Sequence, residues 1–385
     1  MSYCLISWGA NSHGQLGQDI QSEECVLARE TDLSRCSLQP ESIKKIVGGA
    51  GHTLILDNHG HVYSCGWNNK GQAGFPINES TLLFRKIEGK LNDNIVVDVA
   101  CGWDCSAALT INGTLFLWGA NNFGQLGKCP KTIRWTHEPF ELAIGRKIKR
   151  VSIGLRHTAL VTEDRKVLVA GSGNKGQLGL SPSEKTELFT AAYAFTEIPT
   201  LTNIQDVVCG QHHTIAITEN GTLFAFGDNK HGQLSLDTET LPRTSFPIKL
   251  PNVRFNPSVE THSGWSHMIA LNEMIILFAD CQIFSWGRNT YGQLGCAGFE
   301  RPSSWKIVRV EGLPRIRQVS VGSEHNVVLT EDGRIFCWGW NEHGNCGNGH
   351  TRDVKLPEQL SFPSNFSAIR VGSGAGHSLA VIKKS

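Results

Sequence analysis

At 385 residues the chain is long enough for two or three average domains, but two short motifs recur along its whole length. The 36 Lys and Arg residues nearly balance the 35 Asp and Glu residues, so the net charge of +1 offers no basis for attraction to nucleic acid or anionic lipid. The 12 cysteines include several that stand singly in apolar segments, as Cys65, Cys209 and Cys337 do, which indicates reduced thiols in an interior and not a disulfide framework.

The first residues and the longest apolar run indicate the broad class of protein. Residues 4–8 already read as a strand, so we expect no signal peptide. The longest apolar run, residues 268–279, contains Asn272 and Glu273 and is too short to span a bilayer. We therefore expect a soluble monomer of the cytoplasm, with the nucleus as an additional location, that does not insert into membranes.

The first recurring motif is a Gly-x-x-His step at the start of an apolar run. It occurs at Gly49–His52, Gly154–His157, Gly210–His213, Gly264–His267, Gly322–His325 and Gly374–His377, with a variant at Gly102–Cys105. The second motif is a glycine-rich corner, typified by WGANSHGQLG. Its seven copies begin at Trp8, Cys65, Trp118, Ala170, Phe226, Trp286 and Trp338. Copies of the first motif lie 52 to 58 residues apart, and this period predicts a propeller or a solenoid.

Between the two motifs the sequence predicts β-hairpins. Turns with Asn or Asp and Gly stand at 57–60, 111–113, 219–221 and 331–333. The fifth hairpin is longer by an apolar insertion, residues 272–281, which we expect to pack on a neighbouring segment, with contact to a partner as the alternative. Residues 180–198 are expected to form a projecting loop.

The two ends of the chain favour a closed ring over a solenoid. The last motif histidine, His377, needs a corner glycine near position 391, but the sequence has 385 residues. The first corner, at Gly9, has no Gly-x-x-His step before it. Strand 4–8 therefore completes the last repeat, which removes an exposed strand edge. We predict an all-β, closed seven-bladed β-propeller with four-stranded blades, formed by a single domain of residues 1–385, in which the N- and C-terminal strands share one blade.

The repeated residues favour structural roles over chemistry. Each motif histidine occupies the same slot of a different blade, so the six do not converge on one point, and we expect each to be hydrogen-bonded within its own blade. Cys101 and Cys105 are spaced wrongly for a zinc knuckle, the glycine-rich corners lack the Gly-Lys-Ser/Thr of a phosphate loop, and no catalytic triad is evident. We expect no metal, no cofactor and no bond-making catalysis by this chain. A repeated glutamine is expected to bind turn backbone through its amide, at Gln15, Gln125, Gln177, Gln233 and Gln293.

The most informative positions are the two variable residues between Gly and His in each step. Equivalent slots in a closed ring lie at one height on one face, so their large and charged members form one mixed ring. We predict that this ring binds a protein partner, because Trp and Arg are frequent anchors of interfaces. The alternative is a solvated rim with buried indoles. The predicted partner-binding residues are Trp103, Asp104, Arg156, His212, Trp265 and Glu324.

The motifs together resemble the regulator of chromosome condensation repeat, and the resemblance covers the whole chain. Segments such as WGANSHGQLG, ACGWDC and SGWSHM are most similar to the secretion-regulating branch of guanine nucleotide exchange factors. The resemblance implies a seven-bladed fold and a small GTPase or a secretory-pathway protein as partner. An exchange factor of this kind acts through the free energy of binding its GTPase, and it makes or breaks no covalent bond.

The chain departs from the founding member of that family, the nuclear exchange factor for the small GTPase Ran. Arg156 stands in the slot of the founding factor's key acid, Ser266 stands in the slot of a histidine, and residues 119–124 lack the aspartate of a second corner. The chain also begins without the founding factor's basic arm for chromatin. Plant ultraviolet-sensing relatives need a repeated Gly-Trp-Arg-His-Thr, of which only isolated Trp103 and Trp265 are present. Ligase relatives need an additional catalytic domain that this length excludes.

Two hypotheses follow from these observations. The first is a regulatory exchange factor acting on a small GTPase in secretion or intracellular traffic. The second is a non-catalytic scaffold that docks partners on one propeller face without exchange.

Overall fold

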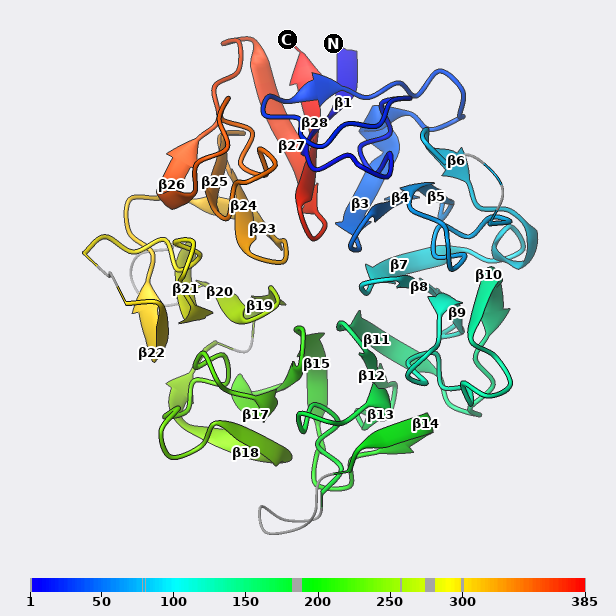
Figure 1. Ribbon diagram of the computed structural model, residues 1–385, viewed down its shortest axis with the longest axis vertical. Helices are drawn as coiled ribbons and strands as arrows, with labels where there is room; N and C mark the ends of the chain where they lie inside the picture. The colour runs from blue at the N-terminus through cyan, green and yellow to red at the C-terminus, as the bar shows by residue number, and fades with distance from the viewer. Residues whose placement is uncertain are drawn as a thin grey trace.

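The computed structural model describes residues 2–77, 79, 81–181, 189–256, 258–273, 281–298 and 301–384. Seven four-stranded antiparallel sheets stand in a ring around a central axis (Figure 1). The predicted all-β propeller with seven blades is confirmed. The apolar insertion at 272–281 lies mostly outside the described residues, which include only its flanking pairs Asn272–Gln282 and Glu273–Cys281.

Each blade contains four strands, which we describe as first to fourth from the ring axis outward. The innermost strands are β3 (Ile43–Gly48), β7 (Val96–Cys101), β11 (Ile148–Ile153), β15 (Ile204–Cys209), β19 (Glu260–Ser263), β23 (Ile316–Val321) and β27 (Phe366–Ser373). The second strands are β4 (His52–Asp57), β8 (Cys105–Thr110), β12 (His157–Thr162), β16 (His213–Thr218), β20 (His267–Glu273), β24 (His325–Thr330) and β28 (His377–Lys384).

In each blade the corner motif begins at the end of the third strand and leads to the outermost strand. The third strands are β5 (Val62–Gly66), β9 (Leu115–Ala120), β13 (Val167–Ser172), β17 (Thr222–Asp228), β21 (Cys281–Arg288), β25 (Ile335–Gly339) and β1 (Ser2–Gly9). The outermost strands are β6 (Arg85–Lys86), β10 (Trp135–Glu141), β14 (Ala191–Glu197), β18 (Arg243–Arg254), β22 (Ser303–Arg309), β26 (Val354–Gln359) and β2 (Arg29–Glu30). Two short 3-10 turns, η1 (Pro40–Ser42) and η2 (Gly89–Leu91), complete the described elements.

Strand β14 corrects one expectation. The connection around residues 180–198 was expected to project as a loop, but Ala191–Glu197 pairs with β13 as the outer strand of its blade. The segment escapes a simple strand pattern because an outermost strand is largely solvated and needs no regular apolar alternation.

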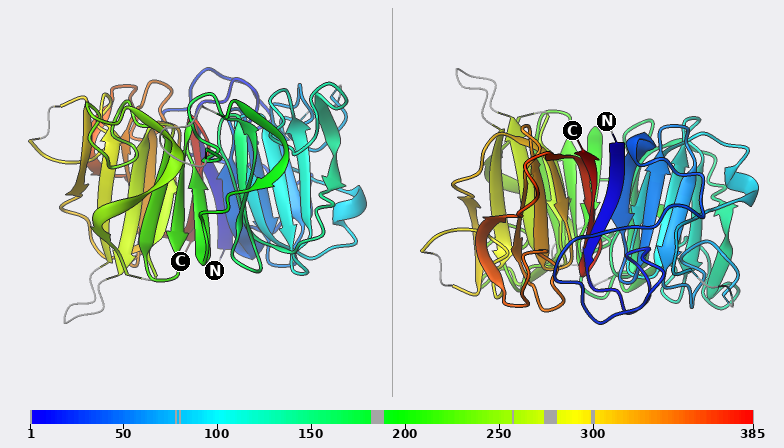
Figure 2. Two further views of the ribbon diagram at one scale, coloured as in Figure 1. Left: turned by 90° about the horizontal axis from the view of Figure 1, so that it is seen from below. Right: turned by 90° about the horizontal axis from the view of Figure 1, so that it is seen from above.

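The ring closes through the two ends of the chain, as predicted. Strand β1 pairs antiparallel with β28 over its whole length, from Ser2 opposite Lys384 to Gly9 opposite His377. The seventh blade therefore has the strand order β2-β1-β28-β27. This register places both ends of the chain at one flat face, as the side views show (Figure 2), and the Gly-x-x-His turns and corner motifs at the other. We refer to the second face as the corner face.

Neighbouring blades are joined by a repeated polar relay beneath the corner face. His157 Nε2 lies 2.9 Å from the hydroxyl of Thr214 in the next blade, and that hydroxyl donates to the carbonyl of Gln177, also at 2.9 Å. Equivalent contacts join His52 to Ser106, His267 to Asn326, His325 to Ser378 and His377 to Thr53. The expectation that each histidine bonds within its own blade is therefore wrong: the bond crosses to the next blade.

The motif tryptophans pack in the same seams. Trp118 is fully buried, and its indole N–H donates to the carbonyl of Gln72 in the preceding blade at 2.9 Å. Trp286 and Trp338 make the equivalent bonds to the carbonyls of Gln233 and Gln293. A buried indole needs such a partner for its N–H, so these contacts fix the angle between blades as well as fill space. Leaving Cys281 aside, the eleven other cysteines are free thiols.

Candidate protein-docking face

The variable pairs are positioned by the turns between the first and second strands of each blade. A backbone N–H from the third corner position bonds the carbonyl of the second variable residue in the same blade, as from Trp340 to Glu324 at 2.8 Å and from Ser172 to Arg156 at 2.8 Å. The corner glycine before it must approach this turn closely: Gly339 has φ +111°, and a Cβ there would lie 2.4 Å from the Glu324 carbonyl oxygen. The corner motif and the variable pair therefore form one unit in each blade.

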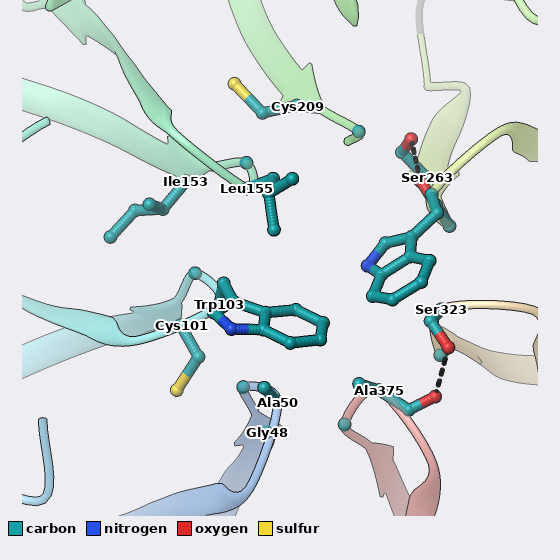
Figure 3. Close-up of a pocket in the computed structure, with 18 of the residues that line it drawn as sticks. Gly48, Ala50, Cys101, Trp103, Ile153, Leu155, Cys209, Ser263, Ser323 and Ala375 are labelled. Carbon is teal, nitrogen blue, oxygen red and sulfur yellow. Dashed lines mark hydrogen bonds between the residues drawn. The ribbon is translucent and has the colours of Figure 1, made fainter. Parts of the chain in front are cut away.

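The first residue of each pair lies close to the ring axis. Backbone N–H groups link these turns around the mouth of the channel, from Ala50 to Trp103, from Gln211 to Trp265, from Trp265 to Ser323 and from Ser323 to Ala375, at 2.8 to 3.0 Å. Trp103 and Leu155 extend into this mouth (Figure 3). The space left there is only about 120 Å³.

Two of the predicted residues meet at the mouth. The ring centroids of Trp103 and Trp265, from the second and fifth blades, lie 5.1 Å apart with the planes tilted by 38°. Both side chains are half-buried. They therefore form a partly exposed apolar surface at the centre of the corner face. Their exposure lies between that of the predicted interface anchors and that of the fully buried indoles considered as the alternative.

Three other predicted residues, Asp104, Arg156 and His212, lie on adjacent blades and form what we call the charged arc. Arg156 is exposed, and its guanidinium carbon lies 4.4 Å from the centroid of the Phe123 ring. Burial raises the pKa of Asp104 to about 6, against the opposing charges of Lys70 and Arg156. Burial lowers the pKa of His212, and the charge of Arg156 contributes in the same direction. The charge of Arg156 thus acts on groups of both flanking blades.

Glu324 is placed differently from the other predicted residues. It is only 4% exposed, and its carboxylate accepts from Arg288 at 3.0 Å and from the Gln293 amide. Burial raises its pKa, while Gln293 and Arg288 lower it. Glu324 therefore lies beneath the surface ring, where it holds Arg288 in place.

A pocket beside the channel mouth contains residues that the sequence interpretation missed. It has a volume of about 390 Å³ and is walled by aromatic residues of the corner motifs in addition to Trp103 and Trp265. These additional rings are His13, Trp67, Tyr291, Trp340 and His343. The signal was present in the sequence, because the third and sixth positions of the corner motif vary in the same way as the pairs before the motif histidine.

The repeated glutamines behave as predicted. The side-chain oxygen of Gln15 accepts the backbone N–H of His13 at 2.9 Å, and Gln293 accepts that of Tyr291 at 2.8 Å. Gln125, Gln177 and Gln233 make the same contact in their own corners. These bonds hold the sixth corner position, which carries several of the pocket residues, in a fixed orientation.

The described residues contain no group of three or more His, Cys, Asp or Glu side chains that could hold a metal ion. Within the same residues, no helix has the length and apolar character needed to cross a membrane. The corner face instead offers rings, one charged arc and a pocket, which are suited to non-covalent recognition.

Comparison with known proteins agrees with the repeat pattern. The RCC1-like domain profile matches residues 4–380. The chain belongs to the RCC1-like family. It is 34% identical to the secretion-regulating guanine nucleotide exchange factor of Bos taurus, covering 98% of this chain and 82% of the relative. It is 28% identical to the regulator of chromosome condensation of Homo sapiens, covering 89% of this chain and 83% of the relative.

Among solved structures, Prp20p from Saccharomyces cerevisiae, studied for its binding to Gsp1p and histones, superimposes with a TM-score of 0.83 at 23% identity. The match covers 100% of this chain and 92% of Prp20p. At this identity the likeness supports the fold. The chain is thus an RCC1-like propeller similar in sequence to guanine nucleotide exchange factors.

Proposed function

We propose that this RCC1-like propeller docks a small GTPase on its corner face and promotes release of the bound guanine nucleotide. The observation that carries the proposal is the combination, on one face, of the Trp103–Trp265 pair with the exposed Arg156. Trp and Arg are enriched among residues that dominate binding energy at protein interfaces. The names of the sequence relatives support a GTPase as the partner, and the secretion-regulating relatives support a role in secretion or traffic.

Nucleotide release of this kind requires no reactive side chain. A protein that binds the nucleotide-free GTPase more tightly than the loaded form must weaken nucleotide binding by the same factor, because the two binding free energies are linked. A rigid face is sufficient for this task. The propeller provides one, since each turn of the corner face is fixed by a backbone bond within its blade and several turns are also bonded to the next blade.

A second candidate function is docking without exchange. It is favoured by the contacts of two predicted residues: Arg156 stacks on Phe123, and the Glu324 carboxylate is already occupied by Arg288 and Gln293. With Glu324 engaged in this way, the face has less negative charge to direct at the phosphate site of a GTPase. In this alternative the protein is a scaffold for a GTPase or a secretory-pathway protein, and we propose that it acts as a monomer of the cytoplasm or nucleus without binding nucleic acid.

The test is the rate at which small GTPases release a fluorescent GDP analogue. One member of each small-GTPase subfamily is loaded and mixed with the propeller, and we expect at least tenfold acceleration for one member. Trp103→Ala, Trp265→Ala and Arg156→Glu should each reduce that acceleration with little loss of folding. Trp305→Ala, on the outer strand β22, is the matched control and should leave it unchanged.

The same panel separates the two candidates. If no member responds, exchange is excluded, and calorimetry with each nucleotide-free GTPase then tests docking alone. Binding that is weakened by the three corner-face variants supports the scaffold. Binding that all three leave unchanged places the interface elsewhere on the molecule.

A further inference from the structure

The pocket beside the channel mouth has the composition of a cation-binding cage. Its walls include the rings of Trp67, Trp340 and Tyr291, and the Trp103–Trp265 pair closes the side next to the axis. Its volume of about 390 Å³ lies within the range of small-ligand pockets and is sufficient for one long side chain. The faces of indole and phenol rings carry negative electrostatic potential and attract cations.

The protein's own Arg288 shows how such a cage holds a cation. Its guanidinium carbon lies 5.2 Å from the centroid of the Tyr291 ring, and its Nη1 lies 3.0 Å from a carboxylate oxygen of Glu324. The Tyr291 ring is in turn 6.3 Å from that of Trp340. A ring and a carboxylate together thus already hold one guanidinium at the wall of the pocket, and the ring of Trp340 stands beside them.

Charge around the pocket favours a second cation. Among the described residues that line it, Arg288 is the one Lys or Arg. Glu324 offsets that charge, and the exposed Glu342 accepts the indole N–H of Trp340 at 3.2 Å. On the opposite side, Glu23 lies near enough to His13 for its charge to act on that ring. Burial lowers the pKa of His13, so the imidazole adds no positive charge at neutral pH. Within the lining, the charges of Arg288 and Glu324 therefore balance, and Glu342 and Glu23 add negative charge next to it.

We propose that this pocket binds the cationic side chain of a lysine or arginine presented by a partner protein. The aromatic walls pack against the aliphatic stem, and the ring faces and Glu342 stabilise the charged end. This proposal does not depend on nucleotide exchange: the pocket can bind a cationic side chain whether or not the protein accelerates nucleotide release from a GTPase.

The experiment compares charged peptides with neutral peptides of the same shape. Ac-Gly-Arg-Gly-NH2 and Ac-Gly-Lys-Gly-NH2 are titrated into the full chain, with the citrulline and norleucine peptides as partners. Binding is followed by the indole N–H signals of Trp67 and Trp340 in NMR spectra. We expect the charged peptides to shift these signals with at least tenfold tighter binding than their neutral partners. Equal binding of charged and neutral peptides, or no shift up to 10 mM peptide, overturns the proposal.

Variants locate the site. Trp340→Ala should weaken binding of the charged peptides at least fivefold, and Glu342→Gln about two- to threefold because its side chain is exposed and its field is screened by solvent. Trp305→Ala removes a partly exposed indole from the outer strand β22 and should have no effect. The proposal fails if Trp305→Ala weakens binding as much as Trp340→Ala does. The comparison of peptides on the unmodified chain remains decisive if a variant does not fold.

Discussion

His157 in the third blade donates its Nε2–H to the hydroxyl of Thr214 in the fourth. The direction of this bond follows from the next contact, since the same hydroxyl lies 2.9 Å from the Gln177 carbonyl, which can only accept. The Asn326 contact in another seam agrees, because its amide nitrogen donates to the Gln293 carbonyl and leaves the oxygen to accept from His267. The motif histidines are thus neutral donors that join one blade to the next.

Thr214→Val is the direct test of this relay. The valine has nearly the same shape but leaves the His157 N–H and the Gln177 carbonyl without a partner in a buried seam. We expect the free energy of unfolding to fall by about 2–4 kcal/mol. Thr214→Ser keeps the hydroxyl and should cost about 1 kcal/mol, for the lost methyl group. Urea denaturation of the two variants checks the prediction, and a loss for valine no greater than for serine would contradict it.

The same histidines predict acid sensitivity. Burial lowers the pKa of His52, His157, His213, His325 and His377 to about 3, and that of His267 to about 4, from an ordinary 6.5. The unfolded chain binds these protons first, so the stabilisation is complete above pH 6.5 and is lost as the pH falls from 6.5 toward 3. At pH 5.5 each histidine favours unfolding by about 1.4 kcal/mol. Six add up to about 8 kcal/mol, which is comparable to a whole domain's stability.

The urea midpoint should therefore fall steeply between pH 7 and pH 5.5. Asp104, with its pKa raised to about 6, acts in the opposite direction, as do Asp206, Glu324 and Asp353, whose pKa values burial also raises, but these four acids stand against six fully buried histidines. The exposed His59 is the control, because His59→Gln should leave the pH profile unchanged. A midpoint that is constant down to pH 5 would show that the imidazoles are protonated in the folded state.

Cys105 marks the seam without a histidine. At the six other motif glycines an added Cβ would lie within 2.5 Å of the motif imidazole, but at Gly102 it would lie 2.5 Å from Cγ2 of Ile153 in the next blade. Ile153 thus lies against this glycine, as the imidazole does in the other blades. Cys105→His should overfill the seam and destabilise the protein by about 1–3 kcal/mol.

The double variant Cys105→His with Ile153→Ser should recover most of that loss. Serine stands in the equivalent slot at Ser263 and Ser373, and the new imidazole would face Thr158, whose hydroxyl already donates to Gln125 at 2.7 Å. Thermal and urea unfolding measure the recovery. A double variant no more stable than Cys105→His alone would contradict compensation between these two positions.

The sequence predicted the blades and the closure because both follow from spacing and strand pattern. It could not assign the histidine bond, since most blades present a histidine and a hydroxyl at the same two positions and the sequence does not say whether the pair meets within a blade or across a seam. It also missed the strand at Ala191–Glu197, which is largely solvated and so lacks the apolar alternation of an inner strand.

The pocket was missed for a geometric reason. Trp265 and Trp340 belong to different motifs, and only the radial position of each turn brings their side chains to one cavity. In sequence Glu324 is another charge in a variable slot, and its burial depends on Arg288 from the neighbouring blade. Residue type predicted which residues form the ring, but the burial of a ring residue such as Glu324 depends on a side chain from the neighbouring blade.

Closure by β1 is the last relationship open to test. Removing residues 1–9 exposes the edge of β28 along its whole pairing and deletes Trp8, whose indole donates to the Asn345 carbonyl at 2.9 Å. We expect the shortened chain to unfold at least about 10 °C lower and to aggregate, because a long unpaired strand edge invites pairing with other chains. A synthetic peptide of residues 1–9 should restore part of the loss. Lys384→Ala breaks the surface pair with Glu30, 3.0 Å long, and the contact of the ammonium with the Phe366 ring, but leaves the strand pairing intact, and it should cost less than about 1 kcal/mol. If the shortened chain unfolded at the temperature of the full chain, the ring would be stable without β1, and the seams between the other blades would carry the stability now assigned to closure.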